Sequence, residues 1–200
     1  MAKTIKFKLF PHQKALFTSK DKIIYLRCGR GAGKTFCAAL LCALRLVEGK
    51  RIVCLSQTSR QSREVMWVEI IKQLDNIVPG KYKANTGAQK ITFGKTGVIY
   101  FASYESLETL RGFTQIALTV CDEACLAPAD LFSVVSFCMR DLPDGVSGQI
   151  VTPQMRQDFE LSNIFTVSLL SSHQNSSFRR VSCELSNKTS IFFAQLEGKS

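Results

Sequence analysis

The stretch from Leu26 to Phe36, LRCGRGAGKTF, carries the residues with the clearest chemistry in the chain. Glycines followed by Lys34 and Thr35 are typical of loops that bind phosphate groups. Backbone N–H groups of such a loop and of the following helix point at the anion, and the lysine adds a positive charge. The usual pattern has a glycine where this chain has Cys28, and a second Gly-Lys-Thr occurs at Gly94 to Thr96.

The sequence around the two stretches differs. Ile23 to Arg27 is a short apolar run of strand character, and Lys34 to Glu48 is apolar almost all round, which predicts a buried helix. The first stretch therefore joins a strand to a helix, as a phosphate loop requires. Gly94 to Thr96 lies between two candidate strands, Ile91 to Phe93 and Val98 to Phe101, and is predicted to be a hairpin turn.

An acidic pair, Asp122 and Glu123, follows another candidate strand, Gln115 to Cys121. In nucleotide hydrolases, an acid at the tip of a neighbouring strand holds Mg²⁺, and a following glutamate polarises the attacking water. Two solvated acids at the end of a strand are the plain alternative. Because the pair occurs together with a phosphate loop, we expect nucleotide binding and Mg²⁺-dependent hydrolysis of ATP.

Further elements must position these residues. Arg51 to Ser56 predicts a buried strand, and Thr58 with Gln61 forms a candidate capping box that opens a helix to about Asn76. Ser103 to Leu110 predicts a short helix.

A last helix and strand complete the pattern. Pro128 is predicted to begin a helix that runs to about Met139, and Gly148 to Thr152 a strand that Pro153 ends. The alternation of strands and helices predicts an α/β fold of the P-loop NTPase class. Its sheet should be mostly parallel and flanked by helices, with a β-hairpin insertion.

Charge is unevenly distributed along the chain. Residues 1–100 carry 19 Lys and Arg against 5 acids, whereas residues 101–200 carry 7 against 11. A basic half favours contact with polyphosphate or nucleic acid. A solvated basic surface explains the charge equally well, so charge alone does not decide.

Length and composition limit the organisation. Two hundred residues with 46% hydrophobic content predict one domain, which we place at residues 1–160, followed by a serine-rich tail at 161–200. The start of the chain lacks the apolar core of a signal peptide, and the longest uncharged apolar run, Phe36 to Leu44, is too short to cross a bilayer. We expect a soluble intracellular protein with reduced thiols. Cys121 and Cys125 could begin a zinc site, but no second pair completes it.

The phosphate loop resembles that of the large terminase subunit, the DNA-packaging motor of tailed bacteriophages. That family has a loop of the form G-R-G-x-G-K-S/T with the first glycine freely replaced. The resemblance covers residues 10 to about 154 and rests on the order of several short motifs. They are Pro11-His12-Gln13, Cys28 to Thr35, Ser56-Gln57-Thr58, Leu110-Arg111-Gly112, Asp122-Glu123-Ala124 and Ile150 to Pro153.

The resemblance implies a role for each matching residue. Lys34 would neutralise the phosphates, Thr35 and Asp122 would hold Mg²⁺, and Glu123 would orient the water. Arg30 would stabilise charge on the transferred phosphoryl group, although a plain loop-surface arginine, with Arg27 close by, is the alternative. The remaining loop residues would bind phosphate through their backbone; they are Gly29, Gly31, Ala32 and Gly33.

Two outlying motifs have implied roles as well. Gln13 would read the adenine edge, with Phe10 stacked on the base; the alternative for Gln13 is an ordinary helix-cap residue. Thr152 would belong to a coupling motif that senses the state of the γ-phosphate, or it simply ends a strand.

The resemblance also implies partners and a location. Double-stranded DNA, the portal protein and the small terminase subunit would be the partners, the subunits could form a homo-oligomeric ring, and the host cytoplasm would be the location. Family members continue into a nuclease domain, and the 47 residues after Pro153 are too few for one, so no nuclease activity is expected. Two alternatives stay open: a truncated prophage remnant that binds nucleotide without turnover, and a superfamily 2 helicase-like ATPase.

Overall fold

The computed structural model describes residues 4–19, 21–28, 31–142, 148–155, 179–182 and 190–195. Most of its strands belong to one sheet: β2 (Ile23–Cys28), β3 (Arg51–Ser56), β4 (Tyr82–Asn85), β5 (Lys90–Phe93), β6 (Gly97–Ser103), β7 (Ile116–Cys121), β8 (Gln149–Met155) and β9 (Arg179–Ser182). Their order is β4-β5-β6-β3-β7-β8-β2-β9, and the pairs from β6 to β9 are parallel. A separate antiparallel pair joins β1 (Thr4–Leu9) to β10 (Ser190–Gln195).

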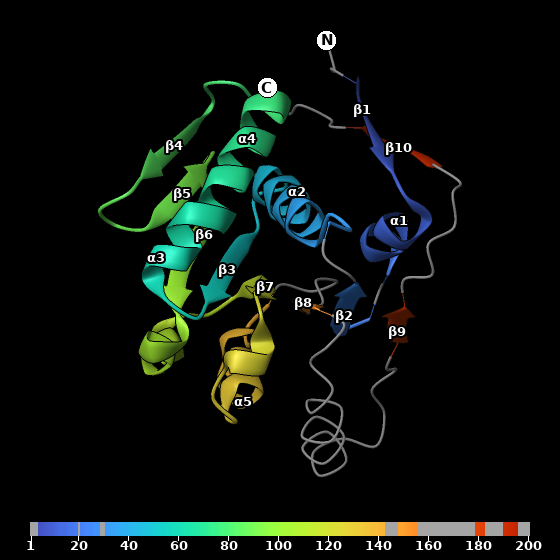
Figure 1. Ribbon diagram of the computed structural model, residues 1–200. Coiled ribbons are helices and arrows are strands. Elements are labelled where there is room, and N and C mark those ends of the chain that lie inside the picture. Colours follow the sequence, from blue (N-terminus) through green and yellow to red (C-terminus); the bar gives the residue numbers. More distant parts are fainter. Residues whose placement is uncertain are drawn as a thin grey trace.

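Helical segments cover both faces of the sheet (Figure 1). They are α1 (Pro11–Thr18), α2 (Lys34–Val47), α3 (Ser59–Gln61), the π-helical η1 (Ser62–Trp67), α4 (Val68–Ile77), the 3₁₀ helices η2 (Tyr104–Gly112) and η3 (Ala124–Leu126), and α5 (Leu131–Cys138). Helices α1, α2 and α4 share one hydrophobic core, and η2 packs with α5 in another. This mostly parallel sheet flanked by helices confirms the predicted fold class.

The central strands are hydrophobic on both sides because both sides are covered. On β3, Ile52 and Cys54 pack in the core under α2 and α4, whereas Val53 and Leu55 pack in the core under η2 and α5. Alternate side chains of a strand point to opposite faces, so one run of apolar residues serves two cores. Helix α2 is buried along most of its length, which explains why its sequence is apolar almost all round.

The second Gly-Lys-Thr is a hairpin turn, as predicted. Strands β5 and β6 pair antiparallel, with Phe93 opposite Gly97, so Gly94 to Thr96 form the connection. The hairpin extends to β4, which pairs with β5 and which the sequence did not predict. In β4 only Tyr82 is partly buried, so the strand shows no apolar alternation.

Pro153 does not end the last strand of the predicted set, and that prediction was wrong. Strand β8 continues to Met155 and stays paired with β2. The carbonyl of Pro153 accepts a hydrogen bond from the backbone N–H of Glu123, at 3.1 Å, beyond the last paired residue of β7, Val120. The N–H that proline lacks therefore faces the side of β7, and the ladder with β2 loses no bond.

The helix predicted from Pro128 begins later, at Leu131. The carbonyl of Pro128 instead accepts a hydrogen bond from the N–H of Leu131, at 3.1 Å, so the proline belongs to a turn that precedes α5. Similarly, the strand predicted from Gln115 begins at Ile116, because Gln115 has a φ of 59°. The boundaries moved while the elements themselves were confirmed.

Two strands come from the segment that we expected to be a serine-rich tail. Strand β9 pairs in parallel with β2, and β10 pairs with β1 near the start of the chain. Both contacts join residues far apart in the sequence, which local patterns do not reveal. The division at residue 160 stays a prediction.

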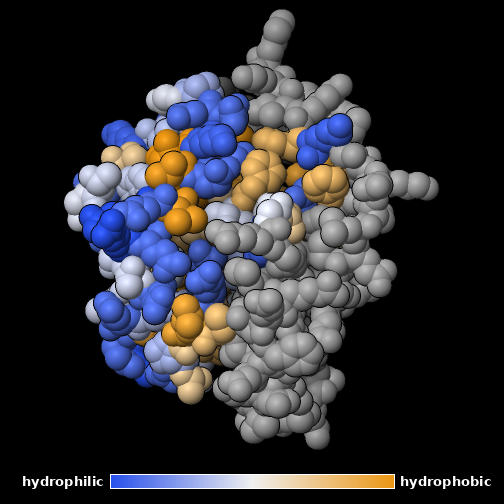
Figure 2. Space-filling model, viewed as in Figure 1, coloured by the Kyte–Doolittle hydropathy of each residue, from blue (hydrophilic) through white to orange (hydrophobic). Residues whose placement is uncertain are grey.

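The described surface is mostly hydrophilic on the side of α3, α4 and β4 (Figure 2). Large exposed hydrophobic side chains are few and come from separate elements: Phe10, Val65, Val68, Leu126 and Phe137. Within the described ranges, no helix has both the length and the hydrophobicity needed to span a membrane.

Candidate functional site

The predicted phosphate loop lies where β2 gives way to α2, at the carboxyl edge of the parallel sheet. Gly31 has a φ of 80° and Gly33 a φ of 75°, a left-handed conformation that glycine adopts without a steric penalty. Gly33 is the N-cap residue of α2, so Lys34 and Thr35 begin the helix. Gly29 and Arg30, which we predicted to bind phosphate and to stabilise charge, lie outside the described residues.

A cavity of about 410 Å³ opens beside the start of α2. It brings together Lys34 and Thr35 of α2 with Asp122 and Glu123, which follow β7. Ligands in parallel α/β sheets bind at this edge, outside the carboxyl ends of the strands. Four of the predicted site residues, from two distant parts of the chain, therefore line one cavity.

Backbone hydrogen bonds fix the acidic pair. The N–H of Asp122 donates to the carbonyl of Leu55 at 2.9 Å, and the Tyr104 hydroxyl donates to the carbonyl of Asp122 at 2.7 Å. Glu123 has a φ of 51° and a ψ of 52°, a conformation that is uncommon for any residue but glycine. The bond from its N–H to Pro153 holds this turn, so β3, β8 and η2 together position the two carboxyl groups.

Burial raises the pKa of the Asp122 carboxyl to about 6, and the neighbouring charge of Glu123 contributes to the increase. The positive charge of Lys34 acts in the opposite direction without cancelling the effect. A second positive charge beside Asp122 would therefore stabilise its ionised form. This is the electrostatic condition that a divalent cation satisfies.

The donor set also fits magnesium better than a metal held by protein alone. In the described part of the chain, no three His, Cys, Asp or Glu side chains gather closely enough to hold a metal ion. Mg²⁺ typically takes one or two carboxylates and completes its octahedron with water and phosphate oxygens. Asp122 and the Thr35 hydroxyl, at the head of α2, match this sparse set.

Gln13 connects the first helix to the phosphate loop. Its side chain is 6% exposed; Oε1 accepts from the N–H of Phe10 at 2.9 Å, and Nε2 donates to the carbonyl of Ala32 at 3.1 Å. A Cβ on Gly33 would lie 2.7 Å from the same Nε2. Gln13 therefore caps α1, the plainer of the two interpretations, and supports the loop from behind. The predicted contacts of Gln13 and Phe10 with adenine stay predictions, and neither residue is among the described residues that line the cavity.

Thr152 lies in β8 opposite Tyr25 of β2 and is fully buried. It is separated from the cavity only by Pro153, which lines it. A role in coupling stays a prediction that this position allows.

The sequence missed two residues of the cavity wall, Gln61 and Val65. Thr58 caps this helical segment as predicted, since its hydroxyl accepts from the N–H of Gln61 at 3.2 Å. The helix then widens into the π-helical η1 before α4 continues. Such π segments are frequent at functional sites, but residue types alone give no signal for them.

Replacing Asp122 with asparagine should stabilise the protein in the absence of metal and nucleotide. The folded protein holds the Asp122 proton up to about pH 6, whereas the unfolded chain releases it near the ordinary value. Wild-type stability therefore falls as the pH rises between these two values. At about pH 8 the variant should gain on the order of 1–3 kcal/mol in the free energy of unfolding, and near pH 3 almost nothing.

Urea denaturation at both pH values measures this difference. Asp130→Asn, at an exposed carboxyl, serves as the matched control and should change stability little at either pH. An Asp122→Asn protein that is less stable than wild type at the higher pH would contradict the expectation.

Comparison with known proteins identifies the family. The model of the family "Terminase large subunit, T4likevirus-type, N-terminal" matches residues 26–136, more than half of the chain. None of the curated protein sequences compared with the chain matches it.

Solved structures of similar fold are large terminases. That of a thermophilic bacteriophage has a TM-score of 0.60 at 18% identity and covers 73% of this chain and 39% of its own. The ATPase domain of the Thermus phage P74-26 large terminase has a TM-score of 0.58 at 17% identity, covering 74% and 65%. The bacteriophage HK97 large terminase has a TM-score of 0.64 at 17% identity, covering 83% and 37%.

These likenesses extend over part of each relative. The chain spans less than two thirds of the length of each of these structures. The first of them, the thermophilic-phage terminase, has also been solved in complex with ADP and with ATP-gamma-S. With the family model over more than half of its residues and the site residues in one cavity, the chain belongs to the family of T4-type terminase large subunits, in their N-terminal part.

Proposed function

We propose that this chain is the ATP-hydrolysing motor part of a viral DNA-packaging terminase. The observation that carries the proposal is the convergence of Lys34, Thr35, Asp122 and Glu123 on one cavity at the N-terminus of α2. Complexes of the thermophilic-phage large terminase with ADP and ATP-gamma-S support nucleotide as the ligand here. Membership of the terminase family supports DNA packaging as the process that hydrolysis drives.

The residues of the cavity divide the work. The first N–H groups of α2 and of the loop at Gly33 donate to phosphate oxygens, since the start of a helix has no internal acceptors for them. Lys34 adds a full charge beside the same oxygens. Glu123, held by the carbonyl of Pro153, accepts a hydrogen bond from the attacking water and orients it.

Thr35 and Asp122 are the residues that would hold Mg²⁺, which neutralises developing charge on the phosphates when it is bound. Ionised Asp122 gains from such a cation because burial raises its pKa. Lys34 lies close enough to lower that pKa, so phosphate and metal would meet between these two side chains.

Partners and location follow from the family and are part of the proposal. Double-stranded DNA is the substrate that is moved, and the portal protein, the small terminase subunit and a ring of identical subunits are its working context in the host cytoplasm. No nuclease step is assigned to the residues of this chain. Arg30 is the proposed arginine that stabilises the transferred phosphoryl group.

Phosphate release from ATP by the purified chain tests the proposed activity. We expect turnover with Mg²⁺ that stops when EDTA is added, and binding of a fluorescent ATP analogue in the same conditions. Binding without turnover, even with DNA and portal present, would support a remnant that holds nucleotide. Absence of both binding and turnover would refute the proposal.

A further inference from the structure

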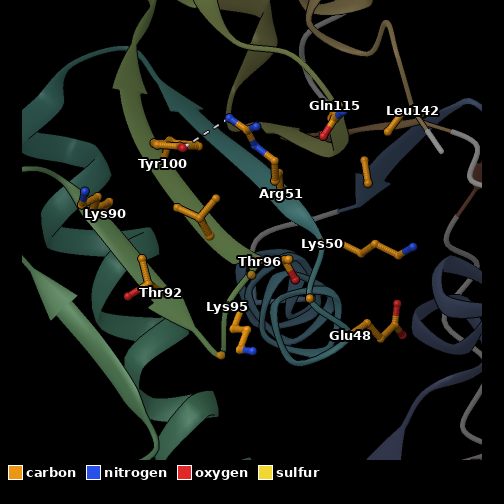
Figure 3. Close-up of a pocket in the computed structure, with 15 residues that line it drawn as sticks. Glu48, Lys50, Arg51, Lys90, Thr92, Lys95, Thr96, Tyr100, Gln115 and Leu142 are labelled. Atoms are coloured by element: carbon orange, nitrogen blue, oxygen red, sulfur yellow. Dashed lines mark hydrogen bonds between the residues drawn. The ribbon is translucent and has the colours of Figure 1, made fainter.

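A second cavity, of about 780 Å³, lies at the opposite edge of the sheet from the candidate nucleotide site. The starts of β3, β6 and β7, the end of α2 and the hairpin between β5 and β6 surround it. Figure 3 shows its labelled side chains converging from these separate elements. The nucleotide cavity lies at the carboxyl ends of the strands, so the two sites share no described residue.

The cavity is strongly basic. Its described lining includes four cations, Lys50, Arg51, Lys90 and Lys95, and one acid, Glu48. Glu48 already pairs with Arg45, at 2.9 Å. Among the residues that the structure describes, none of the four cations forms an ion pair.

Arg51 contributes an unsatisfied donor. Its Nη2 donates to the Tyr100 hydroxyl at 3.4 Å, whereas its buried Nε has no acceptor among the described residues. Figure 3 shows Arg51 reaching toward Tyr100 across the top of the cavity. The ring of Tyr100 stacks on Phe113, with centroids 4.5 Å apart, which fixes the position of the hydroxyl. A buried guanidinium donor without an acceptor favours an external anion.

The end of α2 opposes this charge only weakly. A helix carries partial negative charge at its carboxyl end, on carbonyls that lack partners. Here the carbonyls of Leu44, Leu46 and Arg45 accept hydrogen bonds from the three following N–H groups, of Glu48, Gly49 and Lys50. The full charges of the lysines and of Arg51 therefore dominate the potential in the cavity.

The cavity wall is preformed. A Cβ on Gly97 would lie 2.5 Å from the carbonyl of Leu46, and one on Gly49 would lie 2.7 Å from the Thr96 hydroxyl. The two glycines let the hairpin turn pack directly on the end of α2. The N–H of Val98 also donates to the carbonyl of Lys50, at 3.2 Å. Lys50 and Lys95 are therefore carried on backbones that touch, and little order is lost on binding.

We propose that this cavity is a second anion site that binds phosphate groups, separate from the nucleotide site. Its volume exceeds what one phosphate needs, and its cations come from three different segments of chain, so consecutive phosphates of a polyphosphate or a nucleic-acid backbone fit better than a single ion. The hydroxyls of Thr92 and Thr96 add neutral donors. The site would act whether or not the chain hydrolyses ATP.

A pair of double variants tests the site. Lys90→Ala with Lys95→Ala removes two charges from the cavity, and Lys81→Ala with Lys83→Ala removes two from the same hairpin region outside it; all four side chains are exposed. Binding is measured with inorganic tripolyphosphate and with a labelled DNA duplex, in a Lys34→Ala background that disables the nucleotide site. We expect the cavity variant to weaken binding by about tenfold or more and the control by no more than about threefold.

The two probes identify the source of the phosphates. Duplex binding that tripolyphosphate displaces would assign the site to a nucleic-acid backbone, and tripolyphosphate binding alone would assign it to free polyphosphate; either result supports the proposal. Equal losses in the two double variants would overturn it, because the charge would then act only as a general basic surface. Failure of both probes to bind the Lys34→Ala protein would overturn it as well, independently of ATP turnover.

Discussion

Replacing Lys34 with alanine is expected to remove nucleotide binding and ATP turnover together. Lys34 is the single cation among the described residues that line the nucleotide cavity, so no other side chain there can replace its charge. Loss of charge-assisted hydrogen bonds to phosphate should weaken ATP binding by at least about thirtyfold. Turnover should fall by a further factor on the order of 10² to 10³, since charge develops on the same oxygens in the transition state.

The fold should survive this change, which makes the result interpretable. Alanine is a strong helix former, and Lys34 is the first residue of α2 rather than part of its buried face. Fluorescent-nucleotide binding and phosphate release measure the effect, and circular dichroism checks the fold. Lys83→Ala, on exposed β4, is the control and should behave as wild type. Undiminished turnover in the Lys34→Ala protein would show that the nucleotide binds elsewhere.

The choice of Lys34 over Lys95 could be made from the sequence because it depended on local patterns. An apolar run before the glycines and a long apolar helix after them predict a strand-to-helix loop. Short alternating runs on both sides predict a hairpin. The structure confirmed both, since Lys34 begins α2 and Lys95 lies in the turn between β5 and β6.

Features that depend on contacts distant in the sequence could not be predicted. Whether Pro153 ends a strand depends on which neighbour its missing N–H faces, and the hydrogen bond from Glu123 settles that only in three dimensions. Strand β10 is defined by pairing with β1 at the other end of the chain. In the same way, Gln61 and Val65 reach the nucleotide cavity through a π-helical segment that no pattern announces.

The basic front half illustrates a partial success. Its charge indicated an anionic partner without saying where the contact lies. The fold separates that charge into Lys34 at the carboxyl edge of the sheet and a group around Arg51 at the opposite edge. Net charge predicts the class of ligand, and only topology can divide the charge between two sites.

Replacing Glu123 with glutamine is expected to leave ATP bound and nearly unreacted. Glutamine has the same shape but is a poor acceptor of a proton, so turnover should fall by a factor on the order of 10² to 10⁴. The backbone bond from residue 123 to the Pro153 carbonyl remains, and with it the turn that positions the side chain. Nucleotide affinity should therefore stay within about threefold of wild type.

A pulse-chase measurement distinguishes this variant from Lys34→Ala. Labelled ATP is bound to the protein, excess unlabelled ATP is added, and the label is recovered as ATP or ADP. Glu123→Gln should return intact ATP from a stable complex, Lys34→Ala should retain no label, and Glu105→Gln, an exposed control, should yield ADP as wild type does. ADP at the wild-type rate from Glu123→Gln would assign the orientation of water to another group. Because one variant loses binding and the other only chemistry, the pair separates the phosphate loop from the acidic turn as two parts of one machine.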